Sequence, residues 1–198
     1  MRERERSTRF RQMQAASDKK LLCYTVELAK RFVADFPDSP YGWIYFGDSL
    51  YGLARYSEAI KAFGHAIRLC PKPKRFMVHA RLGHLYSHKG DFRRAEAWYR
   101  KAIAGNPSDA GYRVFLGGLL AIAGRLREAE AVHRRATLCK KGCIDEAYLN
   151  LGLVLRAQER YAEALTCFRK ALKLDPHYKQ AKREIADVER VDQFDARA

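Results

Sequence analysis

Glycine and alanine recur at a fixed spacing along most of the chain. Four glycines are separated by 36, 34 and 35 residues, and an alanine follows each of them after 12 and after 19 residues. The members of the three series are Gly47, Gly83, Gly117 and Gly152; Ala59, Ala95, Ala129 and Ala164; and Ala66, Ala102, Ala136 and Ala171. A repeat of this length predicts one structural unit that is copied and stacked, so that neighbouring copies bury a continuous core.

Within each copy the conserved offsets are those of helices. Large and small residues return three and four positions apart, and the pattern breaks near Arg55, Gly90, Gly124 and Glu159. Each copy is therefore predicted to be a pair of antiparallel helices that approach closely where the small residues lie. Prolines at three of the copy ends, Pro71, Pro107 and Pro176, terminate the second helix because proline has no amide hydrogen.

The pattern resembles the tetratricopeptide repeat (TPR) family, with its W-x2-L-G-x2-Y and A-x3-F-x2-A signatures. The resemblance implies an all-α fold, a right-handed α-α superhelix of four helix pairs. The predicted units are residues 40–73, 76–109, 110–143 and 145–178. Unit three departs from the pattern, with Lys141 in place of the proline and His133 in place of an aromatic residue.

The segments outside the four units are predicted from their apolar spacing. Residues 18–37 form an amino-terminal capping helix, and residues 179–191 form a carboxy-terminal one. Residues 1–17, which are rich in arginine and glutamate, and residues 192–198 are predicted to be mobile tails.

The composition and the cysteine spacing argue against a membrane-spanning or secreted protein, and the charge bears on the kind of partner. The chain lacks an apolar run of about 18 residues, so no membrane span is expected. The first residues lack the apolar core of a secretory signal, and five cysteines have no disulfide-framework spacing, so a cytoplasmic location is predicted. The net charge of +15 favours an anionic partner without choosing among nucleic acid, membrane surface and acidic protein.

The resemblance also implies a functional surface. In the family, the first helices line a concave groove that binds peptides or helices of other proteins. The positions predicted to contact a partner are Tyr41, Tyr45, Asp48, Tyr51, Arg81, His84, Phe115, Leu149 and Asn150. The leading hypothesis is therefore a non-enzymatic adaptor or scaffold that binds a protein partner in this groove. Occlusion of the groove by a tail or a second copy, and self-association, are left open.

A second hypothesis uses the opposite face. Basic residues recur on the second helices at equivalent offsets, and stacking would align them into a ladder that binds phosphates of nucleic acid or of an anionic surface. This basic ladder comprises Arg100, Lys101, Arg134, Arg135, Arg169 and Lys170. The competing interpretation is a solvated face that keeps the protein soluble.

Candidate catalytic and metal chemistry is sparse. His84 and His88 lie four residues apart on one helix, and Asp48 occupies the position equivalent to His84, but a complete metal shell is not apparent. Cys139 and Cys143 lie beside lysines that could lower a thiol pKa, which raises the hypothesis of a redox pair. Neither pattern is specific, so no cofactor, metal site or catalytic residue is predicted.

Overall fold

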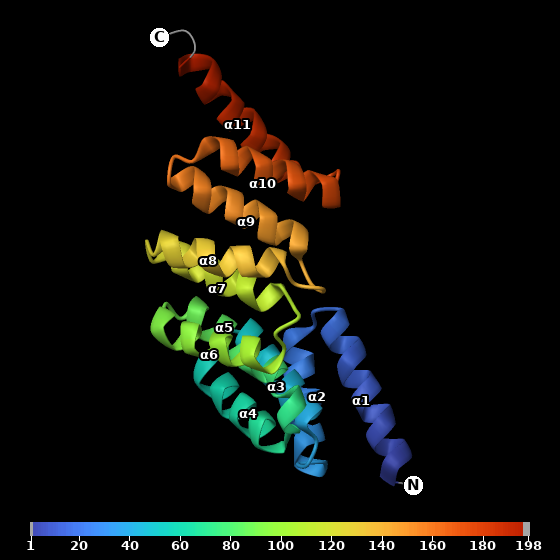
Figure 1. Ribbon diagram of the computed structural model, residues 1–198. Helices are drawn as coiled ribbons and strands as arrows, with labels where there is room; N and C mark the ends of the chain where they lie inside the picture. The colour runs from blue at the N-terminus through green and yellow to red at the C-terminus, as the bar shows by residue number, and fades with distance from the viewer. Residues whose placement is uncertain (1, 196–198) are drawn as a thin grey trace. The chain divides into compact units, whose positions relative to one another are not determined.

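The structure, a computed structural model, describes residues 2–195, with side chains for residues 3–191. The described residues form α-helices and one short 3-10 helix, which confirms the all-α prediction. The chain folds into two compact units, residues 1–105 and 106–198. Each unit consists of antiparallel helix pairs that pack in chain order (Figure 1).

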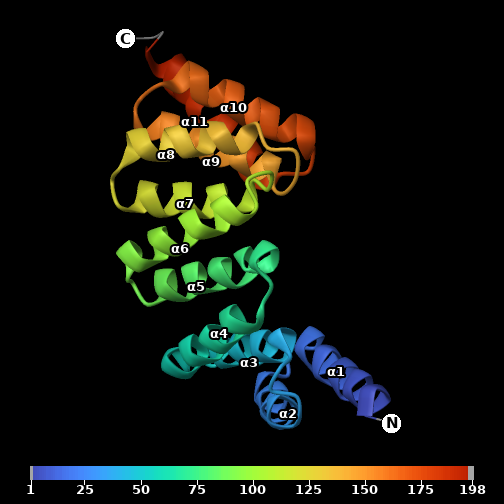
Figure 2. The same ribbon diagram turned by 60° about the horizontal axis from the view of Figure 1, so that its bottom comes forward.

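The first unit contains three helix pairs. Its helices are α1 (Arg2–Asp18), α2 (Leu22–Asp35), α3 (Pro40–Gly52), α4 (Tyr56–Leu69), α5 (Phe76–His88) and α6 (Phe92–Gly105). Figure 2 shows α5 and α6 side by side as one such pair. Ser39 caps the amino terminus of α3 by accepting a hydrogen bond from the Gly42 amide. The basic linker before α5 contains a 3-10 helix, Lys72–Lys74.

The second unit contains two pairs and a final helix. Its helices are α7 (Gly111–Ile122), α8 (Leu126–Thr137), α9 (Ile144–Ala157), α10 (Tyr161–Leu174) and α11 (Lys179–Asp195). Helix α11 packs on α10 through buried Ala181 and Val188. It extends into the segment predicted to be a tail, of which residues 196–198 lie outside the described residues.

In each of four helix pairs, a glycine of the first helix lies against a flat ring of the second helix. A methyl group on Gly47, Gly83, Gly117 or Gly152 would lie within 2.6 Å of the ring found 16 residues later. These rings belong to Phe63, Tyr99, His133 and Phe168, and all four residues are buried. The recurring glycine is therefore required for close approach of the two helices.

The prediction of a mobile tail at residues 1–17 is wrong for residues 2–17, because Arg2–Asp18 form α1, which packs on α2, and residue 1 lies outside the described residues. The predicted capping helix is accordingly the second member of a fifth helix pair. The two helices meet through Met13 and Ala29, both 0% exposed and again 16 residues apart. The large and the small residue have exchanged places relative to the other pairs.

The backbone of the turns shows the same relationship. The turn inside each of the five pairs contains a residue with positive φ, and these residues are separated by 34, 36, 34 and 35 positions. They are Lys20 (55°), Ala54 (57°), Gly90 (75°), Gly124 (73°) and Glu159 (61°). In each turn the following amide donates to the carbonyl five residues earlier, as Leu21 does to Ala16. The α1–α2 pair is thus a repeat by geometry, although its residues depart from the pattern.

Candidate protein-interaction surface

The predicted groove residues of the first unit begin with two tyrosines on α3. Tyr41 is 40% exposed and borders a depression formed with α1. Tyr45 is half-buried, and Phe10 of α1 packs edge-on against its ring at a centroid distance of 5.5 Å. Burial, followed by the nearby charges of Asp18 and Asp48, raises the pKa of Tyr45. Tyr41 therefore remains available to a partner, whereas much of Tyr45 serves the packing of α1.

Asp48 and Arg81 form an ion pair between α3 and α5. The Arg81 Nε atom lies 2.8 Å from both Asp48 carboxylate oxygens, and Nη1 donates to the Met77 carbonyl at 3.1 Å. Burial raises the pKa of Asp48, while the charge and hydrogen bonds of Arg81 oppose the rise. Both side chains are about one third exposed. The pair joins neighbouring first helices and leaves part of each polar group facing solvent.

His84 is held by the second helix of its own pair. Its Nδ1 atom lies 3.0 Å from the Tyr99 hydroxyl, and the two rings meet edge-on. Burial, and then the positive charges of His88 and Arg81, lower the pKa of His84. Tyr51 completes the surface, with its ring 5.4 Å from that of His88. Within residues 2–195 no group of three or more His, Cys, Asp or Glu side chains could hold a metal ion.

The second unit presents a more apolar surface on α7. Phe115 is 41% exposed and Ile122, seven residues later on the same helix, is 74% exposed. Between them a side chain added at Gly118 would meet no atom within 4 Å. The spacing of three and four residues places these positions on one face of α7. Ile122 is a further exposed apolar residue of this face, related to Phe115 by i+7 spacing.

The prediction for Leu149 is wrong, because this side chain is 2% exposed and belongs to the core between α9 and α10. It occupies the same repeat position as Ile44, Ala80 and Val114, and these are buried too. A side chain at this repeat position points between helices, because the position lies one residue before the residue of the inner face. Asn150, the next residue, is partly exposed.

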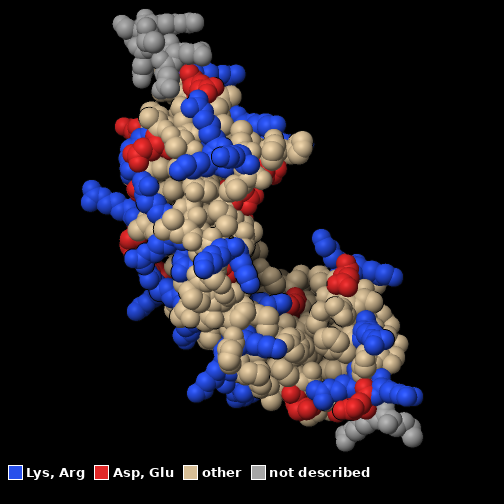
Figure 3. Space-filling model, turned by 45° about the vertical axis from the view of Figure 1, so that its right-hand side comes forward, with Lys and Arg blue, Asp and Glu red and all other residues tan. Residues whose placement is uncertain are grey.

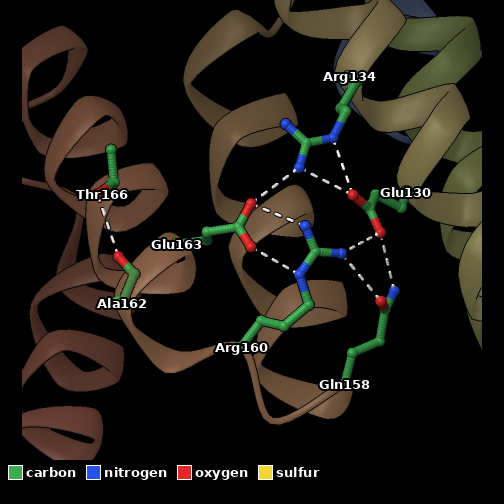
Figure 4. A network of polar contacts seen from close by, with 7 residues as sticks. All are labelled: Glu130, Arg134, Gln158, Arg160, Ala162, Glu163 and Thr166. Atoms are coloured by element: carbon green, nitrogen blue, oxygen red, sulfur yellow. Dashed lines mark hydrogen bonds and ion pairs between the residues drawn. The ribbon is translucent and has the colours of Figure 1, made fainter.

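Three of the six residues of the basic ladder, Arg100, Arg134 and Arg169, pair with glutamates. Arg100 pairs with Glu96, and Arg169 pairs with Glu189. Glu130 accepts from Arg134, Arg160 and Gln158, and Glu163 accepts from both arginines, which joins α8 to the α9–α10 pair (Figure 4). Lys101 lies over the Trp98 ring and Lys170 over that of Tyr148. Figure 3 shows basic side chains spread over the face in view, with acidic side chains beside some of them.

Glu130 is the centre of this network, and its loss should be measurable. Burial raises the pKa of this carboxyl, but hydrogen bonds from Arg134, Gln158 and Arg160 outweigh burial and lower it. We expect Glu130→Gln to cost about 1–3 kcal/mol of unfolding free energy at pH 7. Because the folded pKa is depressed, this contribution is present above the unfolded pKa and is lost as the pH falls through the folded value.

The measurement is urea denaturation of both proteins at pH 7 and pH 3, where the difference should shrink. Glu163→Gln serves as the control, since that side chain is 50% exposed and should contribute less than Glu130 does. Equal losses for the two variants would contradict a central role for Glu130.

The two cysteines of the CKKGC segment do not form an activated thiol pair. Burial raises the pKa of Cys143, and the neighbouring acids Glu146 and Asp145 raise it further. Lys140 and Lys141 were expected to have the opposite effect. Cys139 instead accepts a contact from Arg113 Nη1 at 3.3 Å, which helps to hold the loop before α9. Both residues are free thiols.

Comparison with known sequences identifies the family. The tetratricopeptide repeat profile matches residues 145–178, and a second profile of the same repeat matches residues 80–141. The chain is a tetratricopeptide repeat protein. The first match has the same bounds as the fourth unit expected from the sequence.

Two curated human proteins are similar to part of the chain. It is 35% identical to the human protein O-mannosyl-transferase TMTC1 over 95 residues, which are 48% of this chain and 11% of that protein. It is 29% identical to human tetratricopeptide repeat protein 7B over 133 residues, which are 67% of this chain and 15% of that protein. The chain thus spans a small part of the length of both relatives.

Solved TPR structures share the fold. The carboxy-terminal part of a TPR protein from Cytophaga hutchinsonii superposes with a TM-score of 0.79 at 18% identity, covering 94% of this chain and 72% of that one. YrrB, a TPR protein with an unusual peptide-binding site, superposes with a TM-score of 0.63 at 21% identity, covering 86% and 87%. These likenesses show the fold alone. Among the described residues, no helix has the length and apolar character needed to cross a bilayer.

Proposed function

We propose that this TPR protein is a non-enzymatic adaptor that holds a peptide or helix of a partner protein on the inner faces of its first helices. The observation that carries the proposal is the apolar surface of α7, where Phe115 and Ile122 are exposed on either side of the open space at Gly118. Exposed apolar side chains that share one face of a helix are typical of sites that bind a partner.

The first unit adds aromatic and polar groups to the proposal. Tyr41 offers a large ring that loses little conformational entropy on binding. The Asp48–Arg81 pair is one third exposed and can exchange hydrogen bonds with a peptide backbone. Tyr51, His84 and Asn150 are further contact positions in this proposal. The peptide-binding site of YrrB, on the same fold, is consistent with it.

The proposal excludes catalysis because the candidate groups are engaged elsewhere. Asp48 is paired with Arg81, and His84 is bound to Tyr99. The transferase TMTC1 shares 11% of its length with this chain, so its activity is not part of the proposal. A cytoplasmic adaptor that needs no cofactor is the function that we infer.

Binding of nucleic acid or an anionic surface by the basic ladder is the alternative. Three ladder arginines, Arg100, Arg134 and Arg169, each pair with a glutamate, and the two ladder lysines lie over aromatic rings. A phosphate would have to displace these carboxylates, which reduces the electrostatic gain of binding. The adaptor function is therefore the better supported of the two.

The test uses substitutions that change the inner faces without entering the core. We expect Gly118→Trp combined with Tyr41→Glu to abolish capture of a partner protein from nuclease-treated lysate, because Gly118 has open space and Tyr41 is exposed. Leu138→Glu is the matched control, since Leu138 is 82% exposed and lies outside the inner faces.

Circular dichroism should show the same helical content in all three proteins. A partner that is retained by wild type and control but lost by the double variant would support the proposal. Equal capture by all three would locate the interface elsewhere. Nucleic acid needs a separate measurement with purified protein and added nucleic acid, in which binding that weakens steeply as salt rises would establish the alternative.

A further inference from the structure

Helix α1 is attached to the rest of its unit by few apolar side chains. Phe10, Met13 and Ala16 are the apolar residues that it buries wholly or in part, and arginine, glutamate, glutamine and serine make up most of the remainder. Phe10 contacts the rings of Phe32 and Tyr45. By comparison, each other pair of the unit buries apolar residues along both helices.

The polar contacts of α1 help to fix its position on the unit but add little to its stability there. Arg9 pairs with Asp35, and Arg6 lies 3.3 Å from Asp38, and all four side chains are at least 40% exposed. Exposed ion pairs of this kind contribute little to stability. Depressions lie on both sides of the helix, one bordered by Arg9, Gln12 and Leu28 and another by Glu3, Ser7 and Tyr41. Helix α1 is therefore seated on α2 and α3 without tight packing along its edges.

The turn after α1 holds a strained residue. Lys20 adopts φ 55°, in the left-handed region, where the equivalent turns of the second and third predicted units have Gly90 and Gly124. A residue with a Cβ atom is disfavoured there. If α1 swung away from α2, Lys19–Leu21 could become helical and join α1 to α2 in one continuous helix, which would relieve the strain.

These features together point to exchange of α1 between molecules. We propose that two copies of the chain form a dimer in which each α1 docks on α2 and α3 of the other copy. The molecule that binds this surface is a second copy because the surface of α2 and α3 fits α1 itself. It buries the apolar side chains of Phe10 and Met13. It also places Asp35 and Asp38 opposite Arg9 and Arg6. A short, strained connection beside a loosely packed helix is the arrangement that favours such an exchange.

Two substitutions at Lys20 should shift the dimer in opposite directions. Lys20→Gly removes the strain from the monomer and weakens the continuous helix, so we expect the dissociation constant of the dimer to rise at least about thirty-fold. Isoleucine is unfavourable at positive φ, so Lys20→Ile should lower the dissociation constant. Light scattering coupled to size exclusion, on full-length protein equilibrated over a range of concentrations, gives the constants.

Glu159→Gly is the matched control, since Glu159 has φ 61° in the turn between the tightly packed helices α9 and α10. It should leave the association constant unchanged. Phe10→Asp should abolish the dimer, because it removes the ring that α1 inserts between Phe32 and Tyr45.

The exchange is refuted if wild type and Lys20→Ile remain monomeric at the highest concentration, or if a dimer forms that neither Lys20→Gly nor Phe10→Asp weakens. Partner capture by the inner faces is a separate measurement, so either proposal can fail alone.

Discussion

Replacing Gly117 with alanine should destabilise the second unit by about 2–3 kcal/mol, although alanine is the better helix former. The new methyl group would lie 2.4 Å from His133 Nε2 and 2.5 Å from Cε1. The imidazole is 1% exposed and held between two helices, so it has no space into which it can move. The helices α7 and α8 would have to separate, which costs packing along their length.

Gly118, the next residue, supplies the matched control. Its Cβ position is open, so Gly118→Ala should stabilise the same helix by up to about 1 kcal/mol. Urea denaturation followed by circular dichroism at 222 nm compares the two variants, whose propensity changes are identical. A third variant, Gly117→Ala with His133→Ala, should lose less than the sum of its single changes. Similar stability of the Gly117 and Gly118 variants would disprove the close-contact explanation.

Replacing His133 with phenylalanine should stabilise the protein at pH 7 and more strongly in acid. Neither ring nitrogen of His133 has a hydrogen-bond partner among the described residues, and burial lowers the pKa of His133 to about 4. Phenylalanine already occupies the equivalent site opposite Gly47 and Gly152. Removing two unsatisfied buried nitrogens should therefore gain about 1–3 kcal/mol at pH 7.

The pH dependence follows from the sign of the shift. The unfolded imidazole, with a pKa of 6.5, binds a proton before the folded one does, so wild-type stability falls as the pH drops from about 6.5 towards 4. This loss reaches about 3 kcal/mol at pH 4 and is absent from His133→Phe. Denaturation curves between pH 7 and pH 4 test it, with His177→Phe as an exposed control. Parallel stability profiles of wild type and His133→Phe would contradict it.

Much of the fold could be predicted because the repeat residues report packing directly. Gly47 and its equivalents mark where a ring approaches a helix backbone, and Ala59 and its equivalents are all 0% exposed. The α1–α2 pair was missed for the same reason. Met13 and Ala29 give the same fit with the sizes reversed, and a search for small and large residues in their usual order cannot find it.

The candidate surface could be predicted less well. Repeat positions indicate which helix carries a residue but do not resolve a rotation of one residue, which is why Leu149 is buried and Asn150 is not. The charges of the basic ladder were visible in the sequence, whereas their pairing depends on side chains from three helices. Glu130 meets Arg160 across 30 positions, and no local pattern indicates that contact.

In the α1–α2 pair the large and the small residues have exchanged positions, and this also limits how the repeats can be rearranged. Phe32 stands where the later pairs have alanine, and it fits because a Cβ atom on Gly42 would lie 2.7 Å from its ring. The residues equivalent to Gly42 are Val78, Tyr112 and Ala147. The α1–α2 pair therefore fits only a neighbouring pair that has glycine at the position of Gly42. Duplication, deletion or recombination of repeats could proceed among the later modules, but a new module inserted after α2 would have to carry a glycine at this position.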